Sequence, residues 1–172
     1  MLGQSDMIFA SVGSMLPFER LTQGVDEWAA AHPDVPVFLQ IGEGEYEPRH
    51  CEWARIVPHS DYQKRLEGCT LFVAHVGMGS ILQALEIGKQ MLMLPRRAAL
   101  KEHTTDHQLH TAARFRDTPG LKIVDDVAAL QQEMGRLVHA PMTGSDRIAN
   151  VAPEAFTSRL RAYLTEGMKF AD

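Results

Sequence analysis

Short apolar runs, most of them closed by a glycine or a polar turn, alternate with helix-forming stretches along the chain. The runs predict six strands, at residues 8–12, 37–41, 53–57, 71–74, 91–94 and 121–124. Between them apolar residues recur at helical spacing, as Phe18, Leu21, Val25 and Trp28 do after the first run. Parallel strands need a crossover connection, which is usually a helix. The alternation therefore predicts an α/β fold, a Rossmann-like parallel sheet with helices on both faces.

The size of the chain suits one such domain. It has 172 residues, of which 45% are hydrophobic, and single domains commonly have about 100–200 residues. We expect a single domain over residues 1–172, with a core at about 7–138 and a C-terminal connector and helix at 139–172. Phe156, Leu160 and Leu164 form an apolar stripe on that last helix. Helical spacing alone leaves open whether the stripe packs on the core or docks onto another domain.

Charge and hydropathy exclude some function classes. The net charge is -5 and the basic residues are scattered, so the chain lacks the basic surface that nucleic-acid binding requires. Neither a signal-peptide pattern nor an apolar run of membrane-spanning length occurs. We therefore expect a cytoplasmic protein that binds no nucleic acid.

The segment at residues 71–88 is the most informative about chemistry. A strand leads into a glycine-bearing turn from which a helix starts. The turn contains His75, Gly77, Met78, Gly79 and Ser80. A helix N-terminus exposes unpaired N–H groups and favours a phosphate, and glycines let the anion approach the backbone. The spacing is not GxGxxG, so an ordinary strand-to-helix turn remains the alternative, with His75 either contacting a phosphate or capping the strand end.

Several ordered motifs resemble a known family. They are Ile8-Phe-Ala-Ser-Val-Gly13-Ser14, Pro17-Phe18-Glu-Arg-Leu21, Gln40-Ile-Gly42, Tyr46-Glu-Pro48-Arg-His-Cys51-Glu-Trp53, His75-Val-Gly77-Met-Gly79-Ser80, Gly88-Lys89, Pro95-Arg96 and Glu102-His103-Thr-Thr-Asp106-His107-Gln108. Across about residues 7–137 the chain resembles the C-terminal domain of glycosyltransferase family 28, in particular the short bacterial exopolysaccharide glycosyltransferase subunits. It is more distantly similar to the small catalytic subunit of the dolichol-linked N-acetylglucosamine transferase.

The resemblance implies a GT-B enzyme, in which two Rossmann-like domains face each other, and it implies that this one is the donor-binding half. The ligand would be a UDP-sugar, which is the substrate, so no cofactor is expected. By position, the backbone near Ile56 and Val57 would meet the uracil, and the turn at residues 75–80 would hold the pyrophosphate. The remaining implied contacts are Gly13 and Ser14 lining the cleft, Gln108 at the sugar hydroxyls, and Asp106 and His107 shaping the loop before it. His75 and Gln108 are the candidates for catalytic residues.

At the position of Gln83, related transferases often have a glutamate, and that glutamate binds both ribose hydroxyls. An amide accepts only through its carbonyl, so Gln83 predicts a weaker contact, with Glu86 one turn later as the alternative.

Arg96 offers a cation for the leaving diphosphate or for a uronic acid carboxylate, or else it lies in a solvated loop. His103, His107 and His110 do not share a helix face if Asp106 is the N-cap, so we expect no metal site.

The resulting expectation is a UDP-sugar-dependent, inverting glycosyltransferase subunit acting in exopolysaccharide or glycolipid synthesis. Its partners would be the UDP-sugar, a lipid-linked saccharide acceptor, and a membrane-anchored subunit that binds the acceptor and holds the chain at the inner face of the membrane. Two other interpretations remain open at this point. One is a non-catalytic nucleotide-sugar-binding or regulatory module, and the other is a self-sufficient homodimeric glycosyltransferase.

Overall fold

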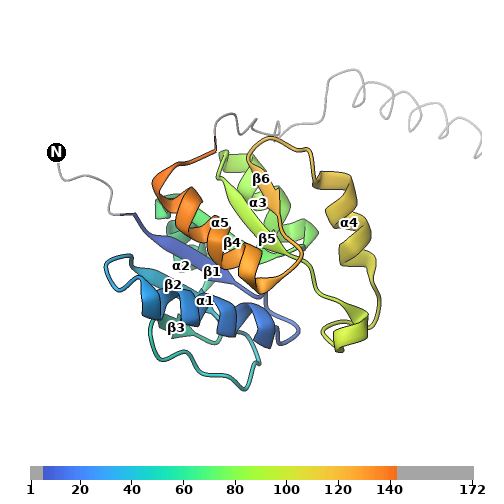
Figure 1. The fold of residues 1–172 in the computed structure, drawn as a ribbon, viewed down its shortest axis with the longest axis horizontal. Helices are drawn as coiled ribbons and strands as arrows, with labels where there is room; N and C mark the ends of the chain where they lie inside the picture. The colour runs from blue at the N-terminus through green and yellow to red at the C-terminus, as the bar shows by residue number, and fades with distance from the viewer. Residues whose placement is uncertain (1–5, 143–172) are drawn as a thin grey trace, which may run out of the picture.

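The computed structural model describes residues 6–142, which form a six-stranded sheet (Figure 1). The strands are β1 (Ile8–Ser11), β2 (Val37–Gln40), β3 (Glu52–Ala54), β4 (Leu71–His75), β5 (Met91–Leu94) and β6 (Leu121–Ile123). Their order is β3-β2-β1-β4-β5-β6 and all neighbours are parallel. This is the Rossmann order, in which the direction of winding reverses between β1 and β4. The predicted fold class is confirmed.

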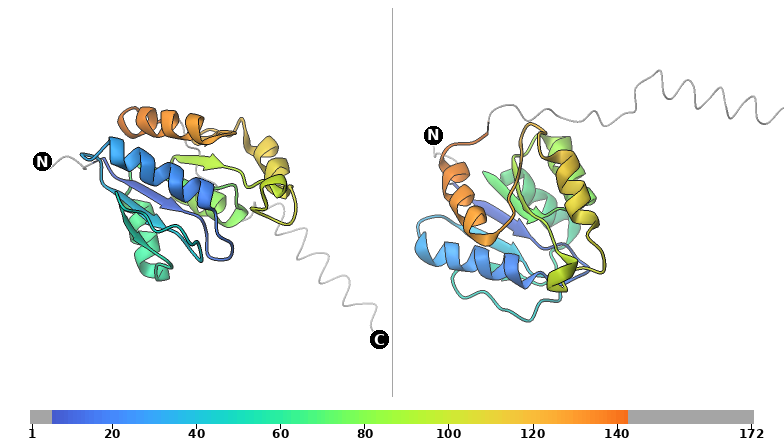
Figure 2. Two further views of the ribbon diagram at one scale, coloured as in Figure 1. Left: turned by 60° about the horizontal axis from the view of Figure 1, so that its bottom comes forward. Right: turned by 45° about the vertical axis from the view of Figure 1, so that its right-hand side comes forward.

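Helices cover both faces of the sheet (Figure 2). They are α1 (Glu19–Ala31), α2 (His59–Gly68), α3 (Met78–Ile87), α4 (His107–Phe115) and α5 (Val127–His139), with a short 3-10 helix, η1 (Ala98–Leu100), before α4. Side chains of α1 and α5 pack on one face, and side chains of α2, α3 and α4 pack on the other. The sheet therefore lies between two helical layers.

The central strand β1 shows why these sequence runs are continuously apolar. Ile8 and Ala10 contribute to the core under α1 and α5, whereas Phe9 contributes to the core on the opposite face. The Phe9 ring stacks on Phe72 of β4 at 5.5 Å between centroids and meets the edge of Tyr62 at 4.9 Å. A strand that is buried on both faces needs apolar residues at every position.

The third strand is shorter than the sequence predicts. We expected it at residues 53–57, but pairing with β2 ends at Ala54. The backbone N–H of Val57 donates instead to Oε1 of Gln40, a side chain at the end of β2, at 2.9 Å. The side chain of Gln40 thus takes the place of a backbone carbonyl of β2 as the acceptor, and the ladder between β2 and β3 does not continue to Val57.

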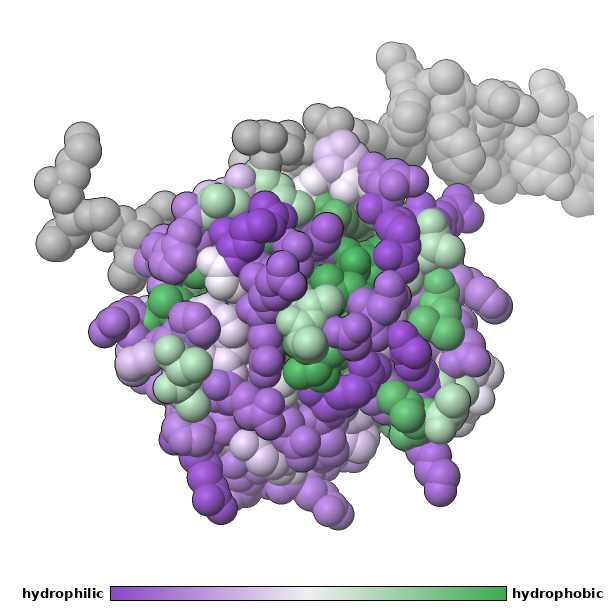
Figure 3. All heavy atoms as spheres, viewed as in Figure 1, coloured by the Kyte–Doolittle hydropathy of each residue, from purple (hydrophilic) through white to green (hydrophobic). Residues whose placement is uncertain are grey.

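The face that carries α1 and α5 is covered mainly by hydrophilic side chains, with small apolar areas between them (Figure 3). Within residues 6–142, no helix is long and apolar enough to cross a membrane. The predicted C-terminal helix with Phe156, Leu160 and Leu164, and most of the predicted connector, lie outside the described residues.

Candidate functional site

A pocket of about 430 Å³ opens at the carboxyl ends of β1 and β4, where the direction of winding of the sheet reverses. Open α/β sheets bind their ligands at this switch point. Ten of the predicted site residues line the pocket: Gly13, Ser14, Ile56, Val57, His75, Gly79, Ser80, Gln83, Arg96 and Gln108. The other four, Gly77, Met78, Asp106 and His107, do not line it. The sequence thus located most of the pocket wall.

The N-terminus of α3 meets the pocket with unpaired donors. Its N-cap, Gly77, has no side chain to cap the helix, and the first N–H with a backbone acceptor is that of Ile81, which donates to the Gly77 carbonyl at 3.0 Å. Within the described chain, no acceptor takes the N–H groups of residues 78–80. A Cβ added at Gly79 would meet nothing within 4 Å, so the space above this turn is open to an anion.

His75 lies at the end of β4, between two glycines. A Cβ added at Gly13 would come within 2.9 Å of the imidazole Cε1, and one at Gly77 would overlap Nε2. Burial, helped by the charge of Arg96, lowers the pKa of His75 to about 4. The ring is therefore neutral at pH 7, and its buried Nδ1 has no hydrogen-bond partner among residues 6–142.

Gln40 belongs to the pocket although our sequence interpretation gave it no role. Its Nε2 donates to the Gly13 carbonyl at 3.1 Å and to Oγ of Ser11 at 3.3 Å, while Oε1 accepts from Val57. Because the N–H of Val57 donates to Gln40, it is not available for the predicted contact with a uracil. The N–H of the neighbouring Ile56 takes part in no hydrogen bond of the described chain.

Three hydroxyl groups meet in the pocket wall. Ser11 of β1, Tyr62 of α2 and Ser80 of α3 all line the pocket. Burial raises the pKa of Tyr62, and the side chains of Ser11 and Ser80 partly offset this rise. Ser80 was predicted from the turn pattern. Ser11 and Tyr62 were missed, because a serine inside a strand and a tyrosine on a helix carry no local signal for a shared site.

Arg96 and Gln108 are buried, with exposed fractions of 2% and 4%. The interpretation of Arg96 as part of a solvated loop is therefore wrong. Four N–H groups of its guanidinium donate to backbone carbonyls, and its own backbone N–H donates to Oε1 of Gln108 at 3.0 Å. Nε2 of Gln108 has no partner in the part of the chain that the structure describes, so it remains available to a ligand.

The loop before α4 differs from the expected arrangement. Asp106 occupies the N-cap position but makes no side-chain cap; its Oδ1 accepts from the N–H of Ala98 at 2.8 Å and closes the loop. The rings of His103 and His107 meet edge to face at 4.3 Å between centroids, and His103 lines the pocket. No three His, Cys, Asp or Glu residues between 6 and 142 are grouped to hold a metal ion.

Gln83 and Glu86 are resolved by their positions on α3. Gln83 lines the pocket and is partly buried, whereas Glu86 is exposed and lies outside the pocket. Of the two candidates for a ribose contact, the geometry favours Gln83.

Residues 7–158 match the glycosyltransferase family 28 C-terminal domain. The chain belongs to this family. No curated protein is significantly similar to it in sequence.

Solved structures show the same fold. The glycosyltransferase of kitacinnamycin is 24% identical, with a TM-score of 0.61, over 79% of this chain and 35% of its own. MurG of Acinetobacter baumannii is 19% identical, with a TM-score of 0.53, over 77% of this chain and 41% of its own. UDP-GlcNAc 2-epimerase of Neisseria meningitidis, solved with bound UDP-GlcNAc, is 11% identical, with a TM-score of 0.60, over 96% of this chain and 46% of its own. The chain thus spans less than half the length of each of these proteins.

Proposed function

We propose that this chain is the donor-binding part of an inverting glycosyltransferase, which transfers a sugar from a UDP-sugar to a lipid-linked acceptor in exopolysaccharide or glycolipid synthesis. The observation that carries the proposal is the set of unpaired N–H groups at residues 78–80, which face an open pocket at the switch point of the sheet. Such a helix end stabilises a diphosphate without a metal ion. Family membership supports the same assignment.

The donor lies across the pocket in this proposal. The uracil meets the free backbone N–H of Ile56, the ribose meets Gln83, and the diphosphate lies between the start of α3 and the loop at Gly13 and Ser14. Nε2 of Gln108 reaches the sugar. The sugar-1-phosphate ester is thereby held with its leaving group against fixed N–H dipoles, which stabilise charge as it develops.

The reaction is a single displacement. The acceptor hydroxyl oxygen bonds to the anomeric carbon, the bond from that carbon to the β-phosphate oxygen breaks, and UDP leaves with the electron pair. The hydroxyl proton passes to a base. Among residues 6–142, no carboxylate lines the pocket, and we assign the base and the acceptor site to a facing, membrane-anchored partner subunit.

Nucleotide preference tests the donor assignment. UDP should raise the melting temperature of the chain more than ADP or GDP does, since a ligand that binds only the native state stabilises it by mass action. Equal shifts for the three diphosphates would remove the uracil site, and no shift with any of them would remove the diphosphate site.

Sugar transfer tests the partner assignment. The chain is assayed alone and together with a candidate partner subunit, using a UDP-sugar and a lipid acceptor. Transfer by the pair and none by the chain alone is expected, because an acceptor that is not positioned forfeits effective-molarity gains of about 7–11 kcal/mol. Turnover by the monomeric chain alone, or UDP binding without transfer in any pairing, contradicts it.

A further inference from the structure

The side chain of Arg96 is the largest fully buried side chain of the described residues. It lies under the loop that joins β1 to α1. Nη2 donates to the carbonyls of Val12 at 2.7 Å and Leu16 at 2.8 Å, and Nη1 donates to the carbonyl of Pro17. One rigid, forked group thus fixes three carbonyls of a seven-residue loop, residues 12–18.

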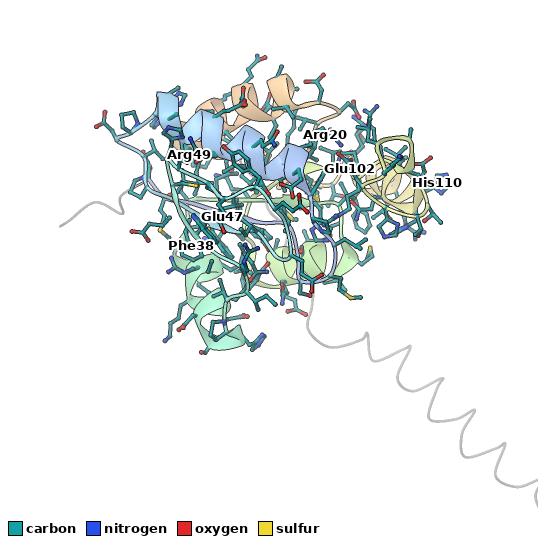
Figure 4. The ribbon with its side chains drawn as sticks, turned by 90° about the horizontal axis from the view of Figure 1, so that it is seen from below. Arg20, Phe38, Glu47, Arg49, Glu102 and His110 are labelled. Carbon is teal, nitrogen blue, oxygen red and sulfur yellow. The ribbon has the colours of Figure 1, made fainter. Side chains whose placement is uncertain are left out.

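The same guanidinium reaches the loop before α4. Nη1 also donates to the backbone carbonyl of Glu102, at 3.3 Å. The carboxylate of Glu102 accepts from Arg20 of α1 at 2.7 and 2.8 Å and from the backbone N–H of Arg97 at 2.9 Å; Figure 4 shows Arg20 and Glu102 beside each other. Two loops from different strands are therefore joined into one unit.

Phe18 closes this unit from the side. Its ring lies 4.7 Å from the guanidinium carbon of Arg96 and 5.4 Å from that of Arg20. Burial lowers the pKa of Arg96 to about 10, and the charge of Glu102 opposes the shift, so the group stays protonated at pH 7. An ion this deeply buried persists only if its donors are satisfied, and here backbone carbonyls satisfy them.

The backbone of Arg96 adds the second half of the arrangement. Its N–H holds Oε1 of Gln108, which orients the amide and leaves Nε2 for a ligand. Side chain and main chain of one residue thus reach the two ends of the pocket, the loop with Gly13 and Ser14 and the side chain of Gln108.

We propose that Arg96 is a positioning residue, which holds the phosphate-facing loop and the sugar-facing Gln108 in one fixed geometry and does not itself bind the donor. This inference rests on the proposed function for the identity of the ligand. Four of the five N–H groups of the guanidinium are already donated to the protein, which argues against the direct ionic contact that the sequence suggested. Lysine cannot replace the fork, because it offers three donors from one nitrogen.

The test compares Arg96→Lys and Arg96→Met with the controls Arg116→Lys and Arg116→Met. Arg116 is an arginine at the end of α4, outside the pocket, whose exposed side chain pairs with Asp125. The backbone N–H groups of Val12 and Gly13, at the start of the loop between β1 and α1, donate to the Gln40 carbonyl and to Oγ of Ser11. In the ligand-free chain, amide hydrogen exchange at these two residues should accelerate at least tenfold in both Arg96 variants. In the Arg96 variants, exchange within the strands of the sheet should stay as in the wild type. In the Arg116 control variants, exchange should stay as in the wild type throughout.

Ligand binding then separates positioning from general damage. Calorimetry with UDP should show at least tenfold weaker binding to Arg96→Lys, while uridine, which has no phosphate, should bind this variant as it binds the wild type. The Arg116 variants should bind UDP within twofold of the wild type. A loss limited to the diphosphate is not produced by general destabilisation.

Three results would overturn the inference. The first is wild-type UDP affinity together with wild-type exchange at Val12 and Gly13 in Arg96→Lys. The second is an equal loss for UDP and uridine, and the third is failure of both Arg96 variants to fold, which would make Arg96 a requirement of the fold. If the wild type binds no nucleoside diphosphate, the proposed function fails, whereas the exchange comparison still decides whether Arg96 holds the loop.

Discussion

The imidazole of His75 fills the space beside Gly77 that a side chain would need: a methyl group on Gly77 would overlap Nε2 of the ring. The backbone of Gly77, with φ -106, is open to any residue, so the contact alone requires glycine here. Gly77→Ala should therefore displace His75, lower the free energy of unfolding by about 1–3 kcal/mol, and weaken UDP binding. Denaturant unfolding and calorimetry measure the two effects, and an unchanged pair of values would show that the ring moves aside without cost.

Gly79→Ala is the matched variant two residues later. A Cβ at Gly79 would meet no protein atom within 4 Å, and alanine in a helix is favoured over glycine by about 1 kcal/mol. We expect the variant to unfold no more easily than the wild type but to bind UDP more weakly, since the methyl group enters the space assigned to the diphosphate. Unchanged UDP affinity would place the diphosphate elsewhere.

The contrast between these glycines shows what the sequence could supply. The strand–turn–helix pattern at residues 71–88 predicted a turn suited to an anion, and in the structure Gly79 and Ser80 of this turn line the pocket. The pattern could not separate Gly77 from Gly79, because their different roles depend on which way the side chain of His75 folds back.

The same limit applies to residues that meet from distant segments. Gln40 ended a predicted strand, yet its side chain fixes Gly13 and Val57 through contacts that no local spacing encodes. Arg96 looked like a surface cation, because it is one of two adjacent arginines, Arg96 and Arg97, in the long segment between a predicted strand and a predicted helix. Its burial depends on carbonyls supplied by residues 12–17. Periodicity predicted the helices and strands, whereas contacts between residues far apart in the sequence determine the pocket.

The pKa of His75 makes stability depend on pH. The folded value is about 4, against an ordinary value of 6.5, so between these values the unfolded chain binds more protons and stability falls as the pH decreases. A shift of this size corresponds to roughly 3 kcal/mol lost between pH 6.5 and pH 4. His75→Asn should reduce this slope when the free energy of unfolding is measured at several pH values; His103, whose pKa is also lowered, keeps its contribution in both proteins. Equal slopes would contradict the assignment to His75.

Asp26, on α1, anchors the loop between β2 and β3. Its buried carboxylate accepts from the Tyr46 hydroxyl at 2.7 Å and from the backbone N–H groups of Arg49 at 3.1 Å and His50 at 2.8 Å. Asp26→Asn should lower the free energy of unfolding by on the order of 3 kcal/mol, since hydrogen bonds to a charged group contribute about 1.5–3 kcal/mol each. Asp34→Asn, at an exposed position, is the control and should have little effect.

The Asp26 loss should also depend on pH. Burial alone would raise the pKa of Asp26, but the hydrogen bonds from Arg49, Tyr46 and His50 outweigh it and hold the pKa below 3.8. The carboxylate therefore contributes its stability above the unfolded pKa, and this contribution is lost as the pH falls through the folded pKa. The difference between wild type and Asp26→Asn should shrink at low pH; a constant difference would point to packing instead of charge.

Gln83 offers the sharpest test of how the pocket meets a nucleotide. Its side chain lines the pocket from the middle of α3. A carboxylate presents two charged oxygens to the two ribose hydroxyls, whereas the amide presents one neutral acceptor. Gln83→Glu should therefore bind UDP several-fold more tightly, by about 0.5–1.5 kcal/mol, and should show a larger preference for UDP over 2′-deoxy-UDP. Glu86→Gln, on the exposed side of the same helix, serves as the control and should leave both affinities unchanged. Weaker UDP binding by Gln83→Glu with an unaltered ribose preference would mean that this side chain faces the diphosphate, and the ribose contact would then have to come from another part of the pocket wall.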